Sequence, residues 1–438
     1  MATPNSVPAK VEEYVHNIRN PEGEGSRTFT RAYTEAAISA ANHFERSRAL
    51  GIEAAPLAGT VVSIKDLFDV RGEVTTAGSR VMETEAPAVR DAEVVRRLRS
   101  AGAIIIGRTN MTEFAFSGLG LNPHYGTPAN PWRREERRIP GGSSSGAAIS
   151  VTDRMADGAI GTDTGGSVRI PAALCGLVGF KPTAGSVPLQ GTLPLSPAFD
   201  SIGPIANDVR QCIKLYAALS GQPEFPPWQR SRQPRLMALK NYVLEGLDAH
   251  VGQTYEAVKA RLSELGCELI ESHSKTISEL PAILEDGGIV AAEAFGWHEG
   301  LLQRKSSFYD PRVRSRILRG SQQRAVDHIR RGLVRSRLIV DWETEIDDVD
   351  AVIMPTVPIA APPIQDLESS DEAYSQANLL LLRNPTTVNA LDGCAVTLPC
   401  HEPGTAPVGL MLVGAHGRDW QLLALAESLT GRLRRHVN

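Results

Sequence analysis

Two segments rich in glycine and serine contain the most chemically suggestive residues of the chain. The first loop is Pro140-Gly-Gly-Ser-Ser-Ser-Gly-Ala-Ala148, and the second loop is Gly161-Thr-Asp-Thr-Gly-Gly-Ser-Val-Arg-Ile-Pro171. The paired glycines of the second loop allow backbone conformations in which successive N–H groups face one point. Such donors can hold the oxyanion that forms during acyl transfer. Ser167 is therefore a candidate nucleophile; the alternative is a glycine turn with a capping serine.

A serine nucleophile needs a base, and Lys65 is the candidate. None of the ten histidines lies in either loop, whereas Lys65 ends the apolar run Val61-Val-Ser-Ile. Burial favours the neutral amine and can lower a lysine pKa by several units from about 10.4. A neutral amine accepts a proton near neutral pH. The alternative is a lysine whose ammonium reaches solvent from the end of a strand.

The first loop also spells Gly-x-Ser-x-Gly with Ser144 at its centre, which is the nucleophile motif of α/β-hydrolases. That motif requires a strand directly before the serine. Residues 130–140 are instead a charged stretch bounded by prolines. We therefore predict that Ser144 is not a nucleophile.

The elements around these residues alternate between short strands and helices, which indicates an α/β protein. Residues 1–55 read mainly as helix. A buried strand is predicted over 57–65, a helix over 91–101 that Asp91 caps and Gly102 ends, and an apolar strand over 103–107. Further strands are predicted at 236–239, 267–270, 349–354 and 408–413, and further helices at 256–265 and 419–433. Between the two loops and after the second, short helical and apolar segments are predicted at 147–151, 158–160 and 170–175, with a short helix beginning at Ile170.

Composition places the chain among ordinary globular proteins. Of its 438 residues, 42% are hydrophobic and 22% charged, with a net charge of −4. These values exclude wholesale disorder and a basic field that would attract nucleic acid or an anionic membrane. The five cysteines lack ligand spacing, so neither a disulfide framework nor a zinc site is predicted. No apolar run reaches the roughly 18 residues of a membrane span, and no signal peptide is visible, which predicts a cytoplasmic protein.

Lys65 and the two loops together resemble the amidase signature family of serine hydrolases. The similarity continues through Phe180-Lys-Pro-Thr183, Asp200-Ser-Ile-Gly-Pro204, Met354-Pro-Thr-Val-Pro358 and residues 389–414. The resemblance implies the amidase signature fold, an α/β fold whose central mixed β-sheet is covered on both faces by helices. It implies one domain over 1–438, with a helical region at 1–55, the signature core at 56–220, and a part lining the substrate pocket at 221–438.

The same resemblance implies roles for individual residues. Ser167 would be the nucleophile, Ser143 a proton relay on an unusual cis peptide, and Lys65 the general base. The remaining implied roles are an oxyanion hole from the N–H groups of Thr164, Gly165, Gly166 and Ser167, support from Asp163 and Arg169, and an acyl pocket lined by Ala115, Phe116 and Ser117.

The activity implied is hydrolysis of the C–N bond of a linear carboxamide through an acyl-enzyme, which gives a carboxylate and ammonia or an amine. No metal or organic cofactor would be needed. The expected partner is a small-molecule amide, without nucleic acid or membrane, and the family likeness suggests a homodimer. Two alternatives remain open: an allophanate-type hydrolase of ureides or carbamates, and a partner-dependent glutaminase that resembles the ammonia-releasing component of a glutaminyl-tRNA amidotransferase.

Two regions of the sequence do not determine the identity of the substrate. Asp392-Gly-Cys-Ala395 stands where the family often has Gly-x-Pro-Ala, so Asp392 either meets a substrate N–H or closes a turn. Residues 304–337 hold eleven Lys and Arg, and the acidic run 341–350 follows them. We interpret this stretch as a solvated helical surface rather than a nucleic-acid site. One of its arginines, which include Arg312, Arg314, Arg316, Arg319, Arg330 and Arg331, is a candidate for binding a substrate carboxylate.

Overall fold

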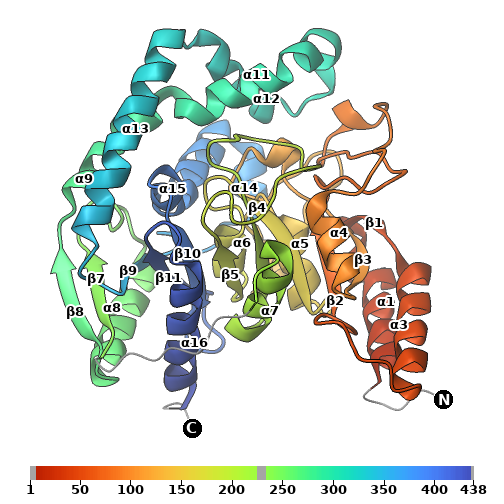
Figure 1. Ribbon diagram of the computed structural model, residues 1–438. Coiled ribbons are helices and arrows are strands. Elements are labelled where there is room, and N and C mark those ends of the chain that lie inside the picture. Colours follow the sequence, from red (N-terminus) through yellow and green to blue (C-terminus); the bar gives the residue numbers. More distant parts are fainter. Residues whose placement is uncertain (1–5, 224–232, 436–438) are drawn as a thin grey trace.

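The computed structural model describes residues 6–223 and 233–435, and an eleven-stranded mixed sheet runs through these residues (Figure 1). The strand order is β1-β3-β2-β4-β6-β5-β10-β11-β9-β7-β8. The strands are β1 (Phe29–Ala32), β2 (Val61–Lys65), β3 (Ile104–Thr109), β4 (Gly158–Asp163), β5 (Val178–Lys181), β6 (Ser201–Ala206), β7 (Arg235–Leu239), β8 (Glu268–Ser272), β9 (Ala351–Pro355), β10 (Cys394–Pro399) and β11 (Gly409–Gly414).

Helices surround the sheet, as Figure 1 shows. They are α1 (Val7–Arg19), α2 (Gly25–Thr28), α3 (Thr34–Ala49), α4 (Glu93–Ser100), α5 (Ser145–Thr152), α6 (Arg169–Leu174), α7 (Val209–Ser220), α8 (Ala249–Glu264), α9 (Lys275–Glu279), α10 (Pro281–Leu284), α11 (Gly288–Lys305), α12 (Pro311–Leu318), α13 (Ala325–Glu345), α14 (Ile364–Ser369), α15 (Asp371–Ala390) and α16 (Asp419–Arg435). Short 3₁₀ helices include η1 (Arg80–Met82), η2 (Glu113–Ala115) and η4 (Glu285–Gly287).

Strand β4 explains why both faces of the sheet are covered. Successive side chains of a strand point to opposite faces. Ala159 packs in a cluster with residues of α5 and α6, whereas the next residue, Ile160, packs in the large cluster that includes α7 and α16. Because β4 is buried along its whole length, it needs apolar or small residues on both faces. The predicted α/β fold, with helices on both faces of a mixed sheet, is confirmed.

The central strands bring the chemically suggestive residues to one edge. Strand β2 pairs in parallel with β3 on one side and with β4 on the other. Loops that follow the carboxyl ends of neighbouring parallel strands lie close together. Lys65, at the end of β2, therefore lies beside Thr162 and Asp163, at the end of β4.

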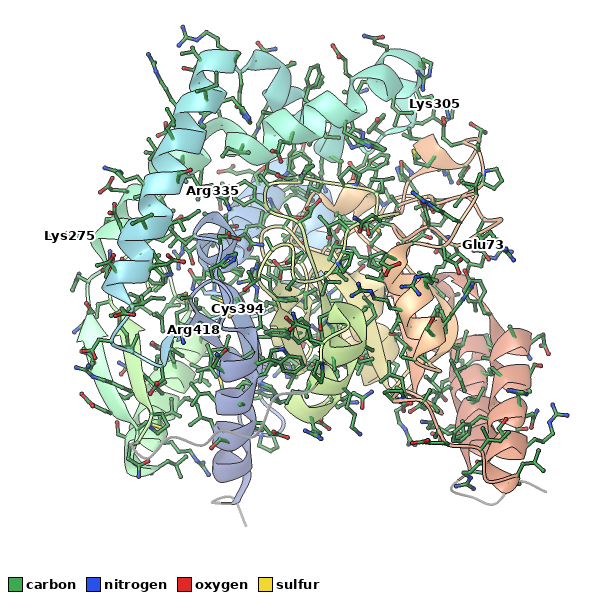
Figure 2. All side chains as sticks on the ribbon, in the orientation of Figure 1. Glu73, Lys275, Lys305, Arg335, Cys394 and Arg418 are labelled. Atoms are coloured by element: carbon green, nitrogen blue, oxygen red, sulfur yellow. The ribbon has the colours of Figure 1, made fainter. Side chains whose placement is uncertain are left out.

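Helices α11 to α13 arch over the sheet (Figure 1). Two side chains labelled in Figure 2, Lys305 and Arg335, connect this arch to other parts of the chain through hydrogen bonds. At the end of α11, the Nζ atom of Lys305 donates to the Val81 carbonyl (2.8 Å) and to Glu85 Oε1 (2.6 Å), close to η1. On α13, Arg335 Nε donates to the carbonyl of Ala390, at the end of α15 (2.9 Å). The arch is thus held against residues distant in sequence.

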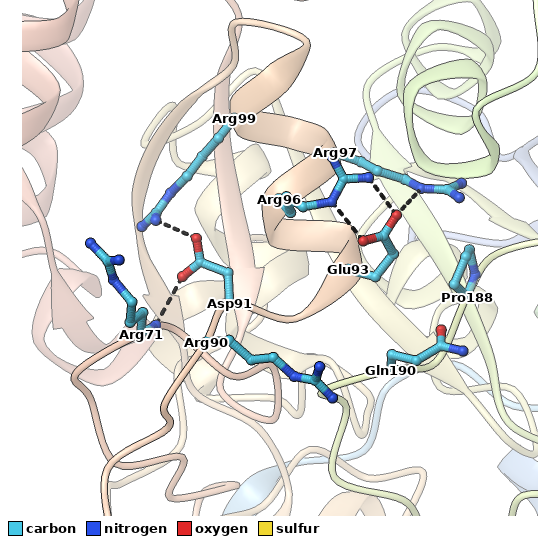
Figure 3. Close-up of a pocket in the computed structure, with 9 residues that line it drawn as sticks. All are labelled: Arg71, Arg90, Asp91, Glu93, Arg96, Arg97, Arg99, Pro188 and Gln190. Carbon is cyan, nitrogen blue, oxygen red and sulfur yellow. Dashed lines mark hydrogen bonds and ion pairs between the residues drawn. The ribbon is translucent and has the colours of Figure 1, made fainter.

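The predicted strands and helices are present, with differences at particular positions. Residues 1–55 also contain β1, which pairs antiparallel with β3 at the edge of the sheet. The prediction that Asp91 caps α4 is wrong. The N-cap is Ala92, and Asp91 instead accepts from the backbone N–H of Arg71 (2.9 Å) and from the Arg99 guanidinium (Figure 3). Asp91 lies one position too early for its carboxylate to reach the first turn.

Within residues 6–223 and 233–435, no helix is long and apolar enough to cross a membrane. All five cysteines are free thiols, and four of them are buried. The same residues hold no group of three or more His, Cys, Asp or Glu arranged to bind a metal ion.

Candidate active site

Lys65 is fully buried at the end of β2. Its Nζ atom donates to the Ser143 hydroxyl (2.7 Å) and to the Thr162 hydroxyl (2.9 Å). Burial lowers the pKa of Lys65 to about 7, although the charges of Asp163 and Asp200 raise it. The structure therefore excludes the alternative in which this ammonium reaches solvent, and the amine is neutral in a large fraction of molecules near pH 7.

The first loop presents Ser143 to Lys65. The peptide bond between Gly142 and Ser143 is cis, as the resemblance implied. Only glycine fits at 142, because a Cβ atom there would lie 2.5 Å from the backbone nitrogen of Gly120. The carbonyl of Ser143 accepts from Thr112 N (3.1 Å). No strand lies between β3 and β4 in the described chain, so the context that a hydrolase nucleophile at Ser144 requires is absent.

The second loop places Ser167 at a cavity. Gly166 has a φ of 121°, in the region that favours glycine, and a Cβ atom there would lie 2.5 Å from the Pro385 side chain. Ser144 N donates to the Ser167 carbonyl (3.3 Å), which joins the two loops. The Ser167 hydroxyl lines the cavity and forms no hydrogen bond, either to Ser143 or to another residue that the structure describes.

A buried ion pair shapes the second loop. Asp163 accepts from Arg169 at both carboxylate oxygens, through Nη2 (2.8 Å) and Nε (3.0 Å). It also accepts from the backbone N–H groups of Gly166 (2.8 Å) and Val168 (3.2 Å). Asn389 of α15 completes the group, because it donates to Asp163 (3.0 Å) and accepts from Arg169 (2.6 Å). Burial alone would raise the pKa of Asp163, but Arg169 and Asn389 hold it well below its usual range.

The N–H groups of the second loop are not equivalent. The Gly166 N–H donates to Asp163, so in this structure it is not free for an oxyanion. The N–H groups of Gly165 and Ser167 form no hydrogen bond with a described residue. Thr164 is held by its hydroxyl, which donates to Asp200, and burial raises the pKa of that carboxyl to about 6. Of the four backbone N–H groups predicted to form an oxyanion hole, that of Gly166 is engaged, whereas those of Thr164, Gly165 and Ser167 form no hydrogen bond with a described residue.

A cavity of about 480 Å³ opens at Ser167. Ala115, Phe116 and Ser117, for which the resemblance implied a place in an acyl pocket, line this cavity. Lys65 and Ser143 are fully buried and are not among its lining residues. The rest of the lining comes from Thr164, Gly165 and Leu195, and from a C-terminal set formed by Tyr242, Leu284, Glu285, Asp286, Gly287, Val290, Arg316, Arg319, Leu379, Leu380, Leu382, Arg383 and Thr386.

The resemblance implied that residues 221–438 line the substrate pocket, but it did not identify most of the individual residues of this C-terminal set, because no motif marks them. The only signal was the run of basic residues at 304–337, which contains Arg316 and Arg319. Asp392 does not line the cavity. It has a φ of 56° in the turn between α15 and β10, and its carboxylate contacts His416 Nδ1 (3.1 Å). The structure thus favours the turn over a substrate contact.

A second hollow, of about 820 Å³, lies on another part of the surface (Figure 3). Five arginines line it, but three of them, Arg96, Arg97 and Arg99, pair with Glu93 and Asp91 inside the hollow. Its lining contains neither a serine nor a lysine. The smaller cavity at Ser167 is therefore the candidate active site.

Comparisons with known proteins indicate the family of the chain. A family model described as Amidase matches residues 10–423. The chain is 35% identical over 389 residues to 2-amino-5-chloromuconic acid deaminase of Comamonas testosteroni, covering 87% of this chain and 84% of that protein. It is 33% identical over 417 residues to the glutamyl-tRNA(Gln) amidotransferase A subunit of Symbiobacterium thermophilum, with the same coverage of 87% and 84%. A crystal structure of an amidase matches with a TM-score of 0.86 and 31% identity, over 98% of this chain and 96% of that one.

Proposed function

The chain belongs to the amidase family, and from this premise we propose that it hydrolyses a carboxamide to a carboxylate and ammonia or an amine through Ser167, Ser143 and Lys65. The observation that carries the proposal is the buried hydrogen bond of 2.7 Å between Lys65 Nζ and Ser143 Oγ. It links a lysine of lowered pKa to the loop beside the cavity-lining Ser167. A buried base next to a serine is the arrangement that activates a hydroxyl nucleophile.

In the first step, Ser167 Oγ attacks the carbonyl carbon of the amide. Its proton passes to Ser143 Oγ, and the Ser143 proton passes to Lys65 Nζ. This relay requires Ser167 and Ser143 to approach each other when substrate binds, because the Ser143 hydroxyl accepts from Lys65 and forms no hydrogen bond with the Ser167 hydroxyl. Catalytic hydrogen bonds are often long in free enzymes and shorten in the substrate complex.

The tetrahedral intermediate carries its negative charge on the former carbonyl oxygen. The free N–H groups of Gly165 and Ser167 are the donors we assign to it. Asp163 and Arg169 do not touch this oxygen; they hold the loop so that both donors stay in place. Ser143 then returns a proton to the departing nitrogen. Water, activated by the same relay, releases the carboxylic acid from Ser167.

Two alternative reactions could be carried out by Ser167, Ser143 and Lys65. The relative from Symbiobacterium thermophilum is named as one component of an amidotransferase, which keeps a partner-dependent glutaminase as the second candidate. A ureide or carbamate hydrolase is the third. A panel of primary amides, anilides, ureido acids and glutamine, tested with the purified chain, separates the three. We expect the chain alone to hydrolyse amides; glutamine turnover that requires an added partner would favour the second candidate.

The nucleophile can be tested independently of the natural substrate. A serine-reactive fluorophosphonate should label the peptide that contains Ser167, as read by mass spectrometry. Ser167→Ala should abolish both the labelling and amide turnover. Ser144→Ala is the matched control, because Ser144 is also buried and is the central serine of the Gly-x-Ser-x-Gly sequence in the first loop, and this variant should keep the labelling. Labelling of Ser144, or turnover by Ser167→Ala at the wild-type rate, would contradict the proposal.

A further inference from the structure

Arg316 of α12 lines the same cavity as Ser167. Its guanidinium lies over the ring of Phe116, with Cζ 4.8 Å from the ring centroid. The Nε atom is buried and has no hydrogen-bond partner. A buried N–H donor without an acceptor costs free energy, so a site that keeps one is arranged for a group that arrives later.

The neighbouring arginines on α12 differ from Arg316 in this respect. Arg312 Nε donates to Asp371 (2.8 Å), and Arg314 donates to the Ser306 carbonyl (3.2 Å). Within the described ranges, no carboxylate forms an ion pair with Arg316 and no acceptor receives a hydrogen bond from it. Burial lowers the pKa of Arg316, and the nearby charge of Arg319 lowers it further, whereas Tyr374 opposes them. Arg316 is thus a cation without a counter-charge.

None of the other lining residues forms an ion pair with Arg316, although Arg319 and Arg383 also line the cavity. Leu195, Leu284, Val290 and Leu382 supply apolar surface to the cavity. Its two acidic residues, Glu285 and Asp286, belong to η4 and are exposed to solvent. The cavity therefore joins three features: a nucleophile at Ser167, an apolar surface, and an unpaired guanidinium stacked on an aromatic ring.

We propose that Arg316 binds a carboxylate of the substrate, so that the substrate class is an amide bearing a carboxylate on the same molecule, such as the monoamide of a dicarboxylic acid. This inference rests on the proposed function. A guanidinium offers parallel N–H donors that match the two oxygens of a carboxylate. The Phe116 ring holds the guanidinium through a cation–π contact. The apolar surface accepts the hydrocarbon between the amide and the carboxylate.

The first test needs no variant. The purified protein is given the terephthalic acid monoamide and, as its uncharged counterpart of similar shape, para-methylbenzamide. Straight-chain monoamides from succinamic to adipamic acid are compared with alkyl amides of equal length. We expect kcat/KM to favour the carboxylated member of at least one pair by about 10- to 100-fold, as for hydrogen bonds to charged groups. Equal kcat/KM values across all pairs would overturn the proposal.

The second test assigns the preference to Arg316. Arg316→Gln should reduce the ratio of kcat/KM between paired substrates to near one, and Arg316→Lys should keep part of it, because the charge remains while the planar fork is lost. Arg330→Gln is the control, since Arg330 is exposed on α13 and does not line the cavity. A ratio in Arg316→Gln equal to that of the wild type would overturn the assignment.

A binding measurement separates this inference from the proposed reaction. Calorimetry with Ser167→Ala protein and the terephthalic acid monoamide reports binding when the proposed nucleophile is absent. We expect binding that Arg316→Gln, added to Ser167→Ala, weakens by about 10-fold or more. If no amide is hydrolysed but this Arg316-dependent binding persists, the proposed reaction fails and the carboxylate site stands. If uncharged amides are hydrolysed but no binding depends on Arg316, the carboxylate site fails and the reaction stands.

Discussion

Two groups of residues at the candidate site, the first of which contributes only Ser167 to the cavity lining, differ in how their charged side chains are paired. We define the floor as Lys65, Ser143, Asp163, Ser167 and Arg169, and the wall as the cavity-lining residues between 242 and 386. On the floor, each charged group has partners: Arg169 and Asp163 form two parallel hydrogen bonds, and the Lys65 amine contacts two hydroxyls. On the wall, Arg316 has no carboxylate partner among the described residues.

This difference separates two tasks. A floor whose polar groups already hold one another keeps its geometry before substrate arrives, which is what stabilising a developing charge requires. A wall with an unpaired cation gains a partner only from the molecule that binds, so its contribution depends on the substrate. The floor is therefore expected to determine the rate of reaction, and the wall the choice of substrate. The predictions that follow test this division.

The largest effect is expected from Lys65→Ala. Removing the proposed base should lower kcat on any amide by about 10⁴-fold or more, because members of a catalytic triad act as a unit. Lys181→Met is the matched control: Lys181 is also a buried lysine of lowered pKa, but its amine donates to the carbonyls of Pro182 and Gly393. Steady-state kinetics measures kcat for both variants and shows whether the loss is specific to Lys65. Wild-type kcat in Lys65→Ala would remove Lys65 from the mechanism.

Next in size is the effect of Asp163→Asn on stability. The substitution leaves the buried Arg169 guanidinium without its counter-charge, which costs about 3–5 kcal/mol of unfolding free energy. Urea denaturation followed by circular dichroism measures this loss. Glu93→Gln, which removes the partner of two arginines at the surface of α4, should cost far less. Similar losses in the two variants would show that the floor does not depend on its buried pair.

The pH dependence should reveal the state of Lys65. Only the neutral amine accepts a proton, and its pKa is about 7, so the active fraction falls as pH drops through that value. Between pH 8 and pH 5, kcat/KM on an uncharged amide should fall by about 100-fold. Asp200→Asn removes a negative charge that raises this pKa, so its midpoint should lie at lower pH. A flat profile from pH 5 to 8 would argue against a lysine base.

The smallest effect belongs to the wall. Phe116→Leu keeps an apolar side chain but removes the ring beneath Arg316, which is worth about 1 kcal/mol for a partly buried cation. The preference for a carboxylated amide over its uncharged counterpart should fall by about 5-fold, as measured by kcat/KM for each. An equal loss on both substrates would mean that Phe116 shapes the pocket without orienting Arg316.

Much of the fold and most of the floor could be predicted from the sequence, because their signals are local. Lys65 ends a five-residue strand that is buried throughout, and the paired glycines mark the turn that presents Ser167. Strands β2, β3, β9 and β11 follow from runs of apolar residues. The failures were also local: the edge strand β1 has only four residues, and Asp91 stands one position outside the cap of its helix.

What the sequence determined by itself is the family of the chain and the residue types able to perform its chemistry. Only the tertiary structure decided that Asn389 joins Asp163 across 226 positions, that the Gly166 N–H is already engaged, and that Arg316 lies in the cavity without a counter-charge. The physical reason is that patterns in the amino-acid sequence indicate only the local structure formed by residues a few positions apart. The pairing of a buried charge depends instead on how distant helices pack over the sheet.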